Sequence, residues 1–453
     1  MNVSPARLAA YEVLWRVQTE DAYASNLLAS SRYDTLAPAD HALAQELTLG
    51  VLRWQLQLDW LIAHFTRRKL AKLDVEVVIA LRLGLYQLLF LTRIPPHAAL
   101  NESVNLVKLH RKFSAAPLVN GVLRAVQRSG KEETKKLFVT IPAPLERLSI
   151  EVSHPQWLLE KWTQRFGINE ARALALTNNQ APQTAFRFNS HIQSEAATRE
   201  WFAAHNIQLR ASSLAPNAAV ITHGSLSAQS DPIQKGWIYL QDEASQLVAH
   251  LAADHQPPTT GHRLLDLCAA PGSKTSLLAS LLPASSLLVA ADLHAHRLQT
   301  MRELTARARI DDIYFVQLDA TQPLPFAGQF DAVLLDAPCS GLGTLQRHPE
   351  IKWRATSAKL HELAALQTKL LANAAAVVPP GGLLVYSVCS TEPEEGEAIV
   401  APLLGAGWAE VTAERLARFG SAGEAVSHSS PGVRTFTHTH HTESFFMCVL
   451  RRL

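Results

Sequence analysis

Two cysteines in the C-terminal half of the chain have the surroundings of reactive groups. Cys339 lies in Leu335-Asp-Ala-Pro-Cys-Ser340, and Cys389 lies in Tyr386-Ser-Val-Cys-Ser390. Each follows an apolar run typical of a buried parallel strand. Each should therefore emerge at the carboxyl end of a strand, where open α/β sheets bind their ligands. Two thiols on neighbouring strand ends, close to one cofactor loop, indicate covalent chemistry on an electrophilic ring.

That cofactor loop is a strand–turn–helix junction upstream of the cysteines. Leu264-Leu-Asp-Leu267 runs as a strand into a turn of small residues and then into a helix. Small residues let the backbone approach a ligand, Gly272 permits a tight turn, and the following helix presents free N–H groups. The residues predicted to line the cofactor are Cys268, Ala269, Ala270, Pro271, Gly272, Ser273 and Lys274.

The loop departs from two phosphate-binding motifs. A dinucleotide site requires Gly-x-Gly-x-x-Gly, whereas this loop has a single glycine. A P-loop requires adjacent Gly and Lys, but Ser273 separates Gly272 from Lys274. A purely structural turn stays open as an alternative.

Acidic residues stand at three successive predicted strand ends, namely Asp292, Asp319 and Asp336. A carboxylate about twenty residues beyond the glycine turn suits a ribose diol, although one such residue often only caps a helix. Three of them after that loop favour a nucleoside cofactor. S-adenosyl-L-methionine fits better than a nucleotide, because nothing obvious in the loop neutralises phosphates.

Two thiols beside such a cofactor suit methyl transfer to C5 of a cytosine. That carbon is a poor nucleophile until a thiolate adds at C6 and turns the ring into an enamine, whose C5 attacks the methyl sulfonium. A base must then remove the C5 proton so that the thiolate can leave, while Asp336 could hydrogen-bond the cytosine N3/N4 edge. Chemistry alone leaves open which cysteine attacks. Cys448, inside an apolar run, is expected to be an inert core residue.

Composition bounds the class of protein. With 453 residues, 47% apolar and 18% charged, the chain should form two or three globular domains. Four cysteines in this length do not make a disulfide framework, and no signal peptide is evident. The most apolar predicted helix, near 77–91, is too short to span a membrane and carries Arg82. These features predict a cytoplasmic protein.

The net charge of +2 hides a basic segment. Residues 67–136 hold 14 Lys or Arg against 5 Asp or Glu. This excess suits a polyanionic partner such as RNA, but it is equally typical of solvated helix faces. The candidate phosphate contacts are Arg67, Arg68, Lys69, Lys108, Arg111, Lys112, Arg124 and Arg128.

The pattern along the chain predicts three parts. Residues 1–140 should be all-helical, with Ser4 capping the first helix and further helices near 39–65, 74–91, 97–112 and 115–127. Residues 149–236 are interpreted as a small α+β unit, with a helix from Pro155, a strand at 185–189 and a helix at 195–205. From 237 to 453 strands and helices alternate as in a parallel sheet, with strands near 263–268, 287–291, 313–318, 330–335, 382–387, 408–412 and 445–450. The histidines of 438–441 are interpreted as a solvated loop, with no metal site.

Several sequence blocks together resemble the Sun/NOL1/NOP2 family of RNA cytosine-C5 methyltransferases. They are the cofactor loop, both cysteine segments, Arg347-His-Pro-Glu-Ile-Lys-Trp353 and Gln241-Asp-Glu-Ala-Ser-Gln246, and the likeness runs from about Ser153 to the end. The N-terminal helices, with Val119-Asn-Gly-Val-Leu-Arg124, are similar to a NusB-like RNA-binding module.

The resemblance implies an all-α NusB-like domain, an RRM-like α+β subdomain and a Rossmann-like class I methyltransferase domain with a seven-stranded, mostly parallel sheet. It implies S-adenosyl-L-methionine as cofactor, bound by the loop with Asp292, Asp319 and Asp336, and small-subunit (16S) rRNA as substrate. In such enzymes Cys389 would be the nucleophile and Cys339 would assist release, with Asp336 orienting the base. We expect a monomer that binds neither DNA nor membrane.

Three alternatives remain at this point. The chain could methylate another RNA such as tRNA, or be a P-loop-like NTPase with Asp336 as a metal-binding acid. It could also be a non-catalytic RNA-binding protein, in which case Cys389→Ala would leave its function intact.

Overall fold

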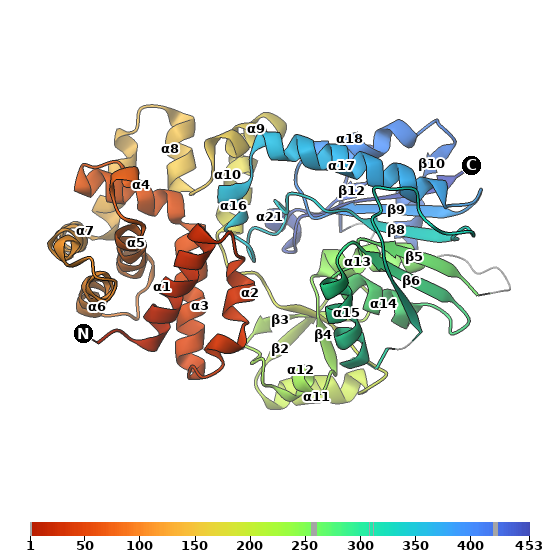
Figure 1. Ribbon diagram of the computed structural model, residues 1–453, viewed down its shortest axis with the longest axis horizontal. Helices are drawn as coiled ribbons and strands as arrows, with labels where there is room; N and C mark the ends of the chain where they lie inside the picture. Colours follow the sequence, from red (N-terminus) through yellow and green to blue (C-terminus); the bar gives the residue numbers. More distant parts are fainter. Residues whose placement is uncertain (1, 255–260, 308, 311, 420–424) are drawn as a thin grey trace. The chain divides into compact units, whose positions relative to one another are not determined.

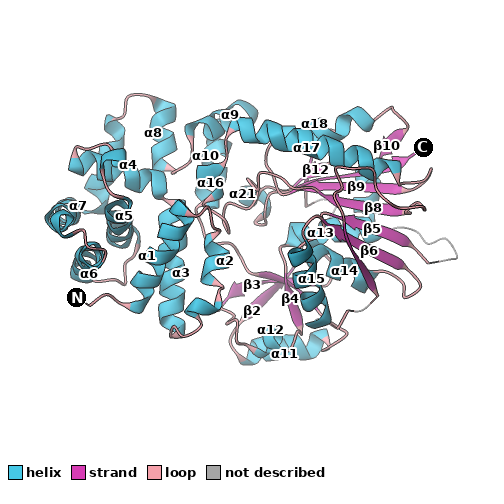
Figure 2. Ribbon diagram, viewed as in Figure 1, coloured by secondary structure: helices cyan, strands magenta, loops and turns pink. Residues whose placement is uncertain are grey.

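The computed structural model describes residues 2–254, 261–307, 309–310, 312–419 and 425–453. By internal contacts these form two compact units (Figures 1 and 2). Unit 1 comprises residues 1–181 and 345–354, and unit 2 comprises 182–344 and 355–453. No helix among the described residues is long and apolar enough to cross a membrane.

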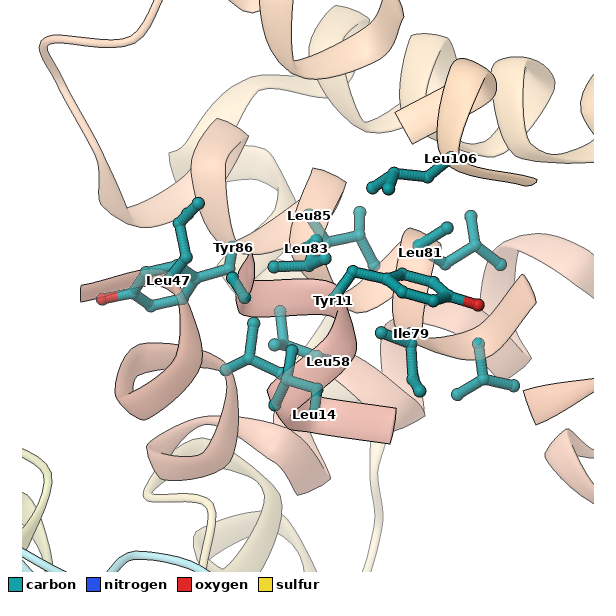
Figure 3. Close-up of a cluster of buried hydrophobic side chains, with 14 of the residues drawn as sticks. Tyr11, Leu14, Leu47, Leu58, Ile79, Leu81, Leu83, Leu85, Tyr86 and Leu106 are labelled. Atoms are coloured by element: carbon teal, nitrogen blue, oxygen red, sulfur yellow. The ribbon is translucent and has the colours of Figure 1, made fainter. Parts of the chain in front are cut away.

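Unit 1 is helical, as the N-terminal pattern predicts. Its helices are α1 (Pro5–Thr19), α2 (Ala24–Leu28), α3 (Pro38–Arg53), α4 (Gln55–Thr66), α5 (Val75–Phe90), α6 (Pro96–Leu109), α7 (Ala116–Lys136), α8 (Pro144–Glu151), α9 (Gln156–Phe166), α10 (Ile168–Asn178) and α16 (Ile351–Arg354). Figure 3 shows Tyr11 of α1 lying among leucines such as Leu81 of α5 and Leu106 of α6, inside the hydrophobic core.

The most apolar helix, α5, is a core helix. It is buried over most of its length, and its one arginine is neutralised rather than exposed. Arg82 Nε and Nη2 donate to the two carboxylate oxygens of Asp59, at 2.6 and 2.8 Å. A bidentate, largely buried pair of this kind allows an arginine inside an apolar helix.

Two helix predictions in unit 1 need correction. Ser4 stands at the N-cap of α1 but makes no capping bond, because its hydroxyl donates to Glu102 Oε2 at 2.7 Å, and a carboxylate is a strong acceptor. The helix expected over 39–65 is two helices, α3 and α4, which break at Trp54. There Lys352 Nζ donates a hydrogen bond to the backbone carbonyl of Arg53 at 2.8 Å, and Trp353 Nε1 donates to that of Leu52 at 2.9 Å.

Unit 2 begins with a small antiparallel sheet. Its strands run in the order β2-β3-β1-β4, with β1 at Ala185–Phe188, β2 at Gln208–Ala211, β3 at Ala218–His223 and β4 at Ile238–Leu240. Helix α11 (Glu195–Ala204) covers one face, where Phe202 stacks on Phe186 with ring centroids 5.2 Å apart. The strand near 185–189 and the helix near 195–205 are thus confirmed. Helices α9 and α10 cluster instead with unit 1, so the domain boundaries stay a prediction.

The second sheet of unit 2 has nine strands among the described residues, in the order β11-β12-β13-β9-β8-β5-β6-β7, with β10 beside β13. Five strands form a parallel core: β7 (Ile313–Gln317), β6 (Leu287–Asp292), β5 (Arg263–Leu267), β8 (Ala332–Asp336) and β9 (Leu383–Val388). The antiparallel strands are β10 (Trp408–Glu410), β11 (Ser427–His428), β12 (Val433–Arg434) and β13 (Phe446–Arg452).

All seven predicted strands of this sheet are present, but the predicted count of seven was wrong. The two additional strands, β11 and β12, have two residues each, and such short strands show no alternation that a sequence could reveal. The histidine segment is also different from expectation. Thr437–His440 forms one helical turn, α21, in which His440 Nδ1 accepts from the backbone N–H of Phe436 at 2.7 Å.

Helices cover both faces of the nine-stranded sheet (Figure 2). Alternate strand residues point to opposite faces, so Leu264 packs against α13 (Glu243–Ala253) and α14 (Ser273–Leu281), whereas Leu265 packs against α17 (Ser357–Ala376). Helix α15 (Ala295–Arg307) packs on Ala290 through Leu298 and Met301. This three-layer α/β arrangement leaves the carboxyl ends of the parallel strands available for a site.

Candidate active site

The two cysteines lie at adjacent strand ends, as predicted. Strands β8 and β9 pair in parallel, and their last paired residues are Asp336 and Ser387. Cys339 follows β8 by three residues, and Cys389 directly follows β9. The two Sγ atoms are 3.2 Å apart, which places both thiols in one small volume at the edge of the sheet.

The pKa of the Cys339 thiol is raised well above its usual range. The main cause is its hydrogen bond with Cys389, and burial adds to the effect, because both disfavour a negative charge on the Cys339 sulfur. In this arrangement the Cys339 thiol keeps its proton.

A lysine–carboxylate pair lies at the same strand ends. Lys274 Nζ and Asp336 Oδ2 are 2.7 Å apart, and Ser387 Oγ donates to Asp336 Oδ1 at 2.7 Å. Burial would lower the pKa of Lys274, but the Asp336 carboxylate outweighs it, so this pKa is raised and the ammonium stays charged. The cofactor loop and the β8 cysteine segment are therefore joined by an ion pair.

The backbone of the cofactor loop is tightly turned. Cys268 has φ 59°, the Ala270–Pro271 peptide is cis, and Gly272 has φ 100°. A Cβ on Gly272 would lie 2.9 Å from Met301 Cγ, so both conformation and space require glycine there. Helix α14 then begins at Ser273 without a side-chain cap, which leaves its first N–H groups directed at the loop.

The three strand-end acids have different surroundings. Asp292 is buried, and its carboxylate accepts from the backbone N–H of Ala270 at 3.2 Å and of His294 at 3.0 Å. Asp336 faces Lys274, as described. Asp319 is exposed and accepts from the N–H and hydroxyl of Thr321, at 2.9 and 2.7 Å, rather than from the cofactor loop. The structure brings Asp292 and Asp336 to the loop residues and leaves Asp319 in a turn of its own.

Cys268 and Cys448 are unlike the contacting pair. Burial, reinforced by Asp292, raises the pKa of Cys268 to about 12. Cys448 lies within β13, is fully buried, and burial likewise raises its pKa to about 12. Thiols with such pKa values stay protonated at neutral pH and are poor nucleophiles.

The candidate RNA contacts of unit 1 are mostly exposed. Arg67, Arg68, Lys69, Arg111, Arg124 and Arg128 are exposed, and Lys108 is half-buried. Lys112 forms an ion pair with Asp74 at 2.9 Å.

Unit 1 also contains a cavity of about 410 Å³ whose walls include Trp54, Phe90 and Lys131, and no predicted catalytic or cofactor residue lines it. No three His, Cys, Asp or Glu side chains in the described part of the chain are grouped to hold a metal ion.

Three parts of the chain match models of known protein families. Residues 255–451 match the family model described as 16S rRNA methyltransferase RsmB/F. Residues 4–128 match the NusB family, and 154–226 match the ferredoxin-like domain of RsmF/B-like methyltransferases. The probable ribosomal RNA small subunit methyltransferase B of Bacillus subtilis is 33% identical over 408 residues, which cover 88% of each chain. Its counterpart from Synechocystis is 32% identical over 99% of each chain.

The chain belongs to the ribosomal RNA small subunit methyltransferase B family.

Solved structures show the same fold as this methyltransferase B family member. The crystal structure of PH0851 covers all of both chains with a TM-score of 0.80 at 23% identity. A methyltransferase homolog protein from Pyrococcus horikoshii gives a TM-score of 0.57 over 69% of this chain and 100% of its own, at 24% identity.

Three polar residues of this methyltransferase B family member were missed by the sequence interpretation. Asp266 is fully buried in β5, accepts from Thr275 Oγ1 at 2.6 Å, and burial raises its pKa to about 7. Ser387 holds Asp336. Glu395 reaches both cysteine segments from a short 3-10 turn, Pro393–Glu395. Asp266 could have been noticed from the sequence, because it is an acidic residue inside an apolar strand. Glu395 could not, because its contact with Ser340 joins residues 55 positions apart.

Proposed function

We propose that this chain methylates C5 of a cytosine in small-subunit rRNA, with S-adenosyl-L-methionine as methyl donor, through a covalent adduct between the cytosine and Cys389. The observation that carries the proposal is the contact of the two thiols, 3.2 Å apart, beside the Lys274–Asp336 pair. Membership of the methyltransferase B family supports rRNA as the substrate, since the relatives named above carry that substrate in their names.

Three features of the cofactor loop support S-adenosyl-L-methionine as the methyl donor. The uncapped N-terminus of α14 and the Lys274 ammonium suit the carboxylate of the methionine part. The buried Asp292 carboxylate holds Ala270, and so orients the loop for a ribose on the same side. When it is bound, S-adenosyl-L-methionine would supply an electrophilic methyl group.

The protein's own residues can account for the remaining steps. The Cys389 thiolate adds to C6 of the cytosine, which makes C5 nucleophilic. Asp336, kept in place by Lys274 and Ser387, hydrogen-bonds the N3/N4 edge of the ring. After C5 has taken the methyl group, a base takes the C5 proton, and the electron pair of that C–H bond restores the C5–C6 double bond. The C6–sulfur bond then breaks, which returns its electron pair to Cys389. Cys339, in contact with the departing sulfur, assists this release.

The role of Asp336 is to balance the charge of the ring. Its carboxyl group accepts a hydrogen bond from the cytosine N4 amino group, and a proton shared between this carboxyl group and N3 disperses the negative charge that thiolate addition at C6 places on the ring. The Lys274 ammonium and the Ser387 hydroxyl occupy the other sides of this carboxylate, so its orientation is set before the base arrives.

The experiment that tests the proposal uses rRNA from a strain that lacks the enzyme. Cys389→Ala should abolish methyl transfer and form no adduct. Cys339→Ala should accumulate a protein–RNA adduct that resists denaturing electrophoresis, because addition occurs and release does not. Cys448→Ala is the matched control, since that thiol is buried within β13 and is not part of the contacting thiol pair, and it should retain transfer.

Mapping the modified base completes this test. An adduct that requires Cys339 and forms with Cys389→Ala would reverse the two roles. Methylation at a position other than cytosine C5 would overturn the proposed chemistry. Thermal stabilisation by ATP, with none by S-adenosyl-L-methionine, would favour the NTPase alternative.

A further inference from the structure

A single buried carboxylate is hydrogen-bonded to both cysteine segments. Glu395 is fully buried. Its Oε1 accepts from the backbone N–H of Ser340 at 2.8 Å and from Gln367 Nε2 at 3.1 Å. Its Oε2 accepts from the hydroxyl groups of Ser340 and Ser390, each at 2.5 Å. Four donors therefore converge on one carboxylate from three separate parts of unit 2.

These donors are neighbours of the reactive thiols. Ser340 directly follows Cys339, and Ser390 directly follows Cys389. Gln367 of α17 donates in addition to the carbonyl of Pro338 at 2.9 Å, on the other side of Cys339. Each cysteine is thus one peptide away from a group that Glu395 binds directly.

The position of Glu395 is itself fixed to the sheet. The Tyr386 hydroxyl, from within β9, donates to the backbone carbonyl of Glu395 at 2.7 Å. The two cysteines, in contrast, lie beyond the last paired residues of β8 and β9. Past that point the backbones of the two segments are joined by Ala337 N–H to Ser387 O and by Gly343 N–H to Cys389 O, both at 2.9 Å. Hydrogen bonds to a charged acceptor are stronger than these neutral ones.

We propose that Glu395 is a positioning residue that holds the attacking and releasing cysteines in register with each other. The inference rests on the proposed function, because it concerns the two steps assigned there to Cys389 and Cys339. Addition at C6 and release occur on the same cytosine, so the two sulfurs must keep their relative position while the ring changes. Glu395 provides this by binding Ser340 and Ser390 with one oxygen atom.

The serines allow the two steps to be tested separately. Ser340→Ala removes the hydroxyl arm to the Cys339 segment, so we expect slower release and more adduct at steady state. Ser390→Ala removes the arm to the Cys389 segment, so we expect slower adduct formation and less adduct. Both variants keep the Glu395 carboxylate and the remaining donors, which separates them from a general loss of the buried charge.

Glu395→Gln tests the whole arrangement. A glutamine has nearly the same volume, but its amide nitrogen is a donor and cannot accept from a serine hydroxyl or a backbone N–H. The hydroxyl groups of Ser340 and Ser390 must then reverse and accept from the amide, and their hydrogen bonds lose the strength that the carboxylate charge gives them. Misplacement of reacting groups by about 1 Å can cost on the order of 100-fold in rate, so single-turnover methyl transfer should fall by 10- to 100-fold.

The measurements use the full-length protein and 16S rRNA that lacks the modification. They are the single-turnover rate, the fraction of protein in the adduct, the affinity for S-adenosyl-L-methionine and the melting temperature. Glu362→Gln is the matched control, because Glu362 is an exposed residue of α17 that pairs with Lys359 at 2.8 Å. A positioning role predicts slow transfer for Glu395→Gln with cofactor affinity within about two-fold of the wild-type value.

Each outcome decides the inference. Opposite changes in adduct level for Ser340→Ala and Ser390→Ala, with slow transfer for Glu395→Gln, would establish it. Wild-type rates in all three variants would overturn it, as would equal losses of transfer and of cofactor affinity. If Glu395→Gln does not fold, the two serine variants decide alone. Absence of any adduct from Cys339→Ala would instead overturn the proposed function itself.

Discussion

At the scale of single residues, the two thiols are in contact at adjacent strand ends, with their sulfur atoms 3.2 Å apart. The pKa of Cys339 is raised by its contact with Cys389 and by burial, so its thiol stays protonated. The residue types alone do not supply the order of steps proposed above, in which Cys389 attacks, since each cysteine follows an apolar strand and precedes a serine.

Asp266 gives a prediction about pH. Its pKa is about 7 in the folded protein, because burial disfavours the charged form, and about 3.9 in an unfolded chain. Between these values the folded state holds a proton that the unfolded state has released, so this group lowers the free energy of unfolding as pH rises. Asp266→Asn has no such proton and can still accept from Thr275.

The margin between the melting temperatures of Asp266→Asn and the wild type should therefore shift in favour of Asp266→Asn from pH 5 to about pH 7 and then level off. Thermal unfolding of both proteins without RNA or cofactor measures this margin. Asp319→Asn is the control, because hydrogen bonds from Thr321 lower the pKa of that exposed carboxyl, and it should show no growing margin. A constant difference between Asp266→Asn and wild type over this range would contradict the assignment.

At the scale of elements, the segment that follows Cys339 packs against the other cysteine. Gly343 N–H donates to Cys389 O, and Ser444 N–H donates to Gly343 O, both at 2.9 Å. A Cβ at Gly343 would lie 1.8 Å from the carbonyl oxygen of Ser444 and 2.9 Å from that of Cys389. Both contacts are with backbone atoms, which cannot move aside without displacing β13 or the Cys389 loop.

Gly343→Ala should therefore destabilise the protein by about 1–3 kcal/mol and also slow methyl transfer. Denaturant unfolding measures the first effect, and the single-turnover rate measures the second. Gly121→Ala, within α7, is the control, because its Cβ would meet no described atom within 4 Å. That change should stabilise the protein by about 0.5–1 kcal/mol. Unaltered transfer in Gly343→Ala would show that the Cys389 loop tolerates movement.

The elements themselves could be predicted where the sequence pattern is strong. The strands β5, β6, β8 and β9 are apolar runs bounded by polar turns, and their ends locate the cysteines, the cofactor loop and Asp336. Glu395 could not be predicted as part of the site. Its segment, Glu394-Glu-Gly-Glu397, contains three acids, and only the folded chain shows that one is buried against Ser340, 55 residues away. Another, Glu397, pairs with Arg434.

At the scale of the whole molecule, the chain leaves unit 2 after Thr344 and returns to it at Ala355. The intervening segment belongs to unit 1, where Lys352 is fully buried and donates to three oxygens, those of Arg53, Ser153 and Asn179, at 2.8–2.9 Å. The sequence block Arg347–Trp353 is part of the family resemblance, but its residue types alone indicate no role. Its contacts could not be foreseen, since they join residues up to 299 positions apart. They make this block a structural part of the helical unit.

The exposed basic residues of unit 1 give a prediction about RNA binding. Each basic residue that contacts a phosphate makes RNA binding more sensitive to salt. Removing one such residue should make the slope of log binding constant against log salt concentration shallower by about 0.7–0.9. Arg68 and Lys69 are exposed and lie outside the core, so Arg68→Ala/Lys69→Ala should fold normally.

Binding of the double variant to unmodified 16S rRNA should be weaker at low salt, and its salt slope should be smaller by between about 1 and 2. Lys359→Ala is the control, since Lys359 is an exposed lysine of α17 in unit 2 that pairs with Glu362. An unchanged slope in the double variant would assign its two charges to solvation of the helical surface. A smaller slope, with an unchanged single-turnover rate at saturating RNA, would assign them to capture of the substrate rather than to the chemical step.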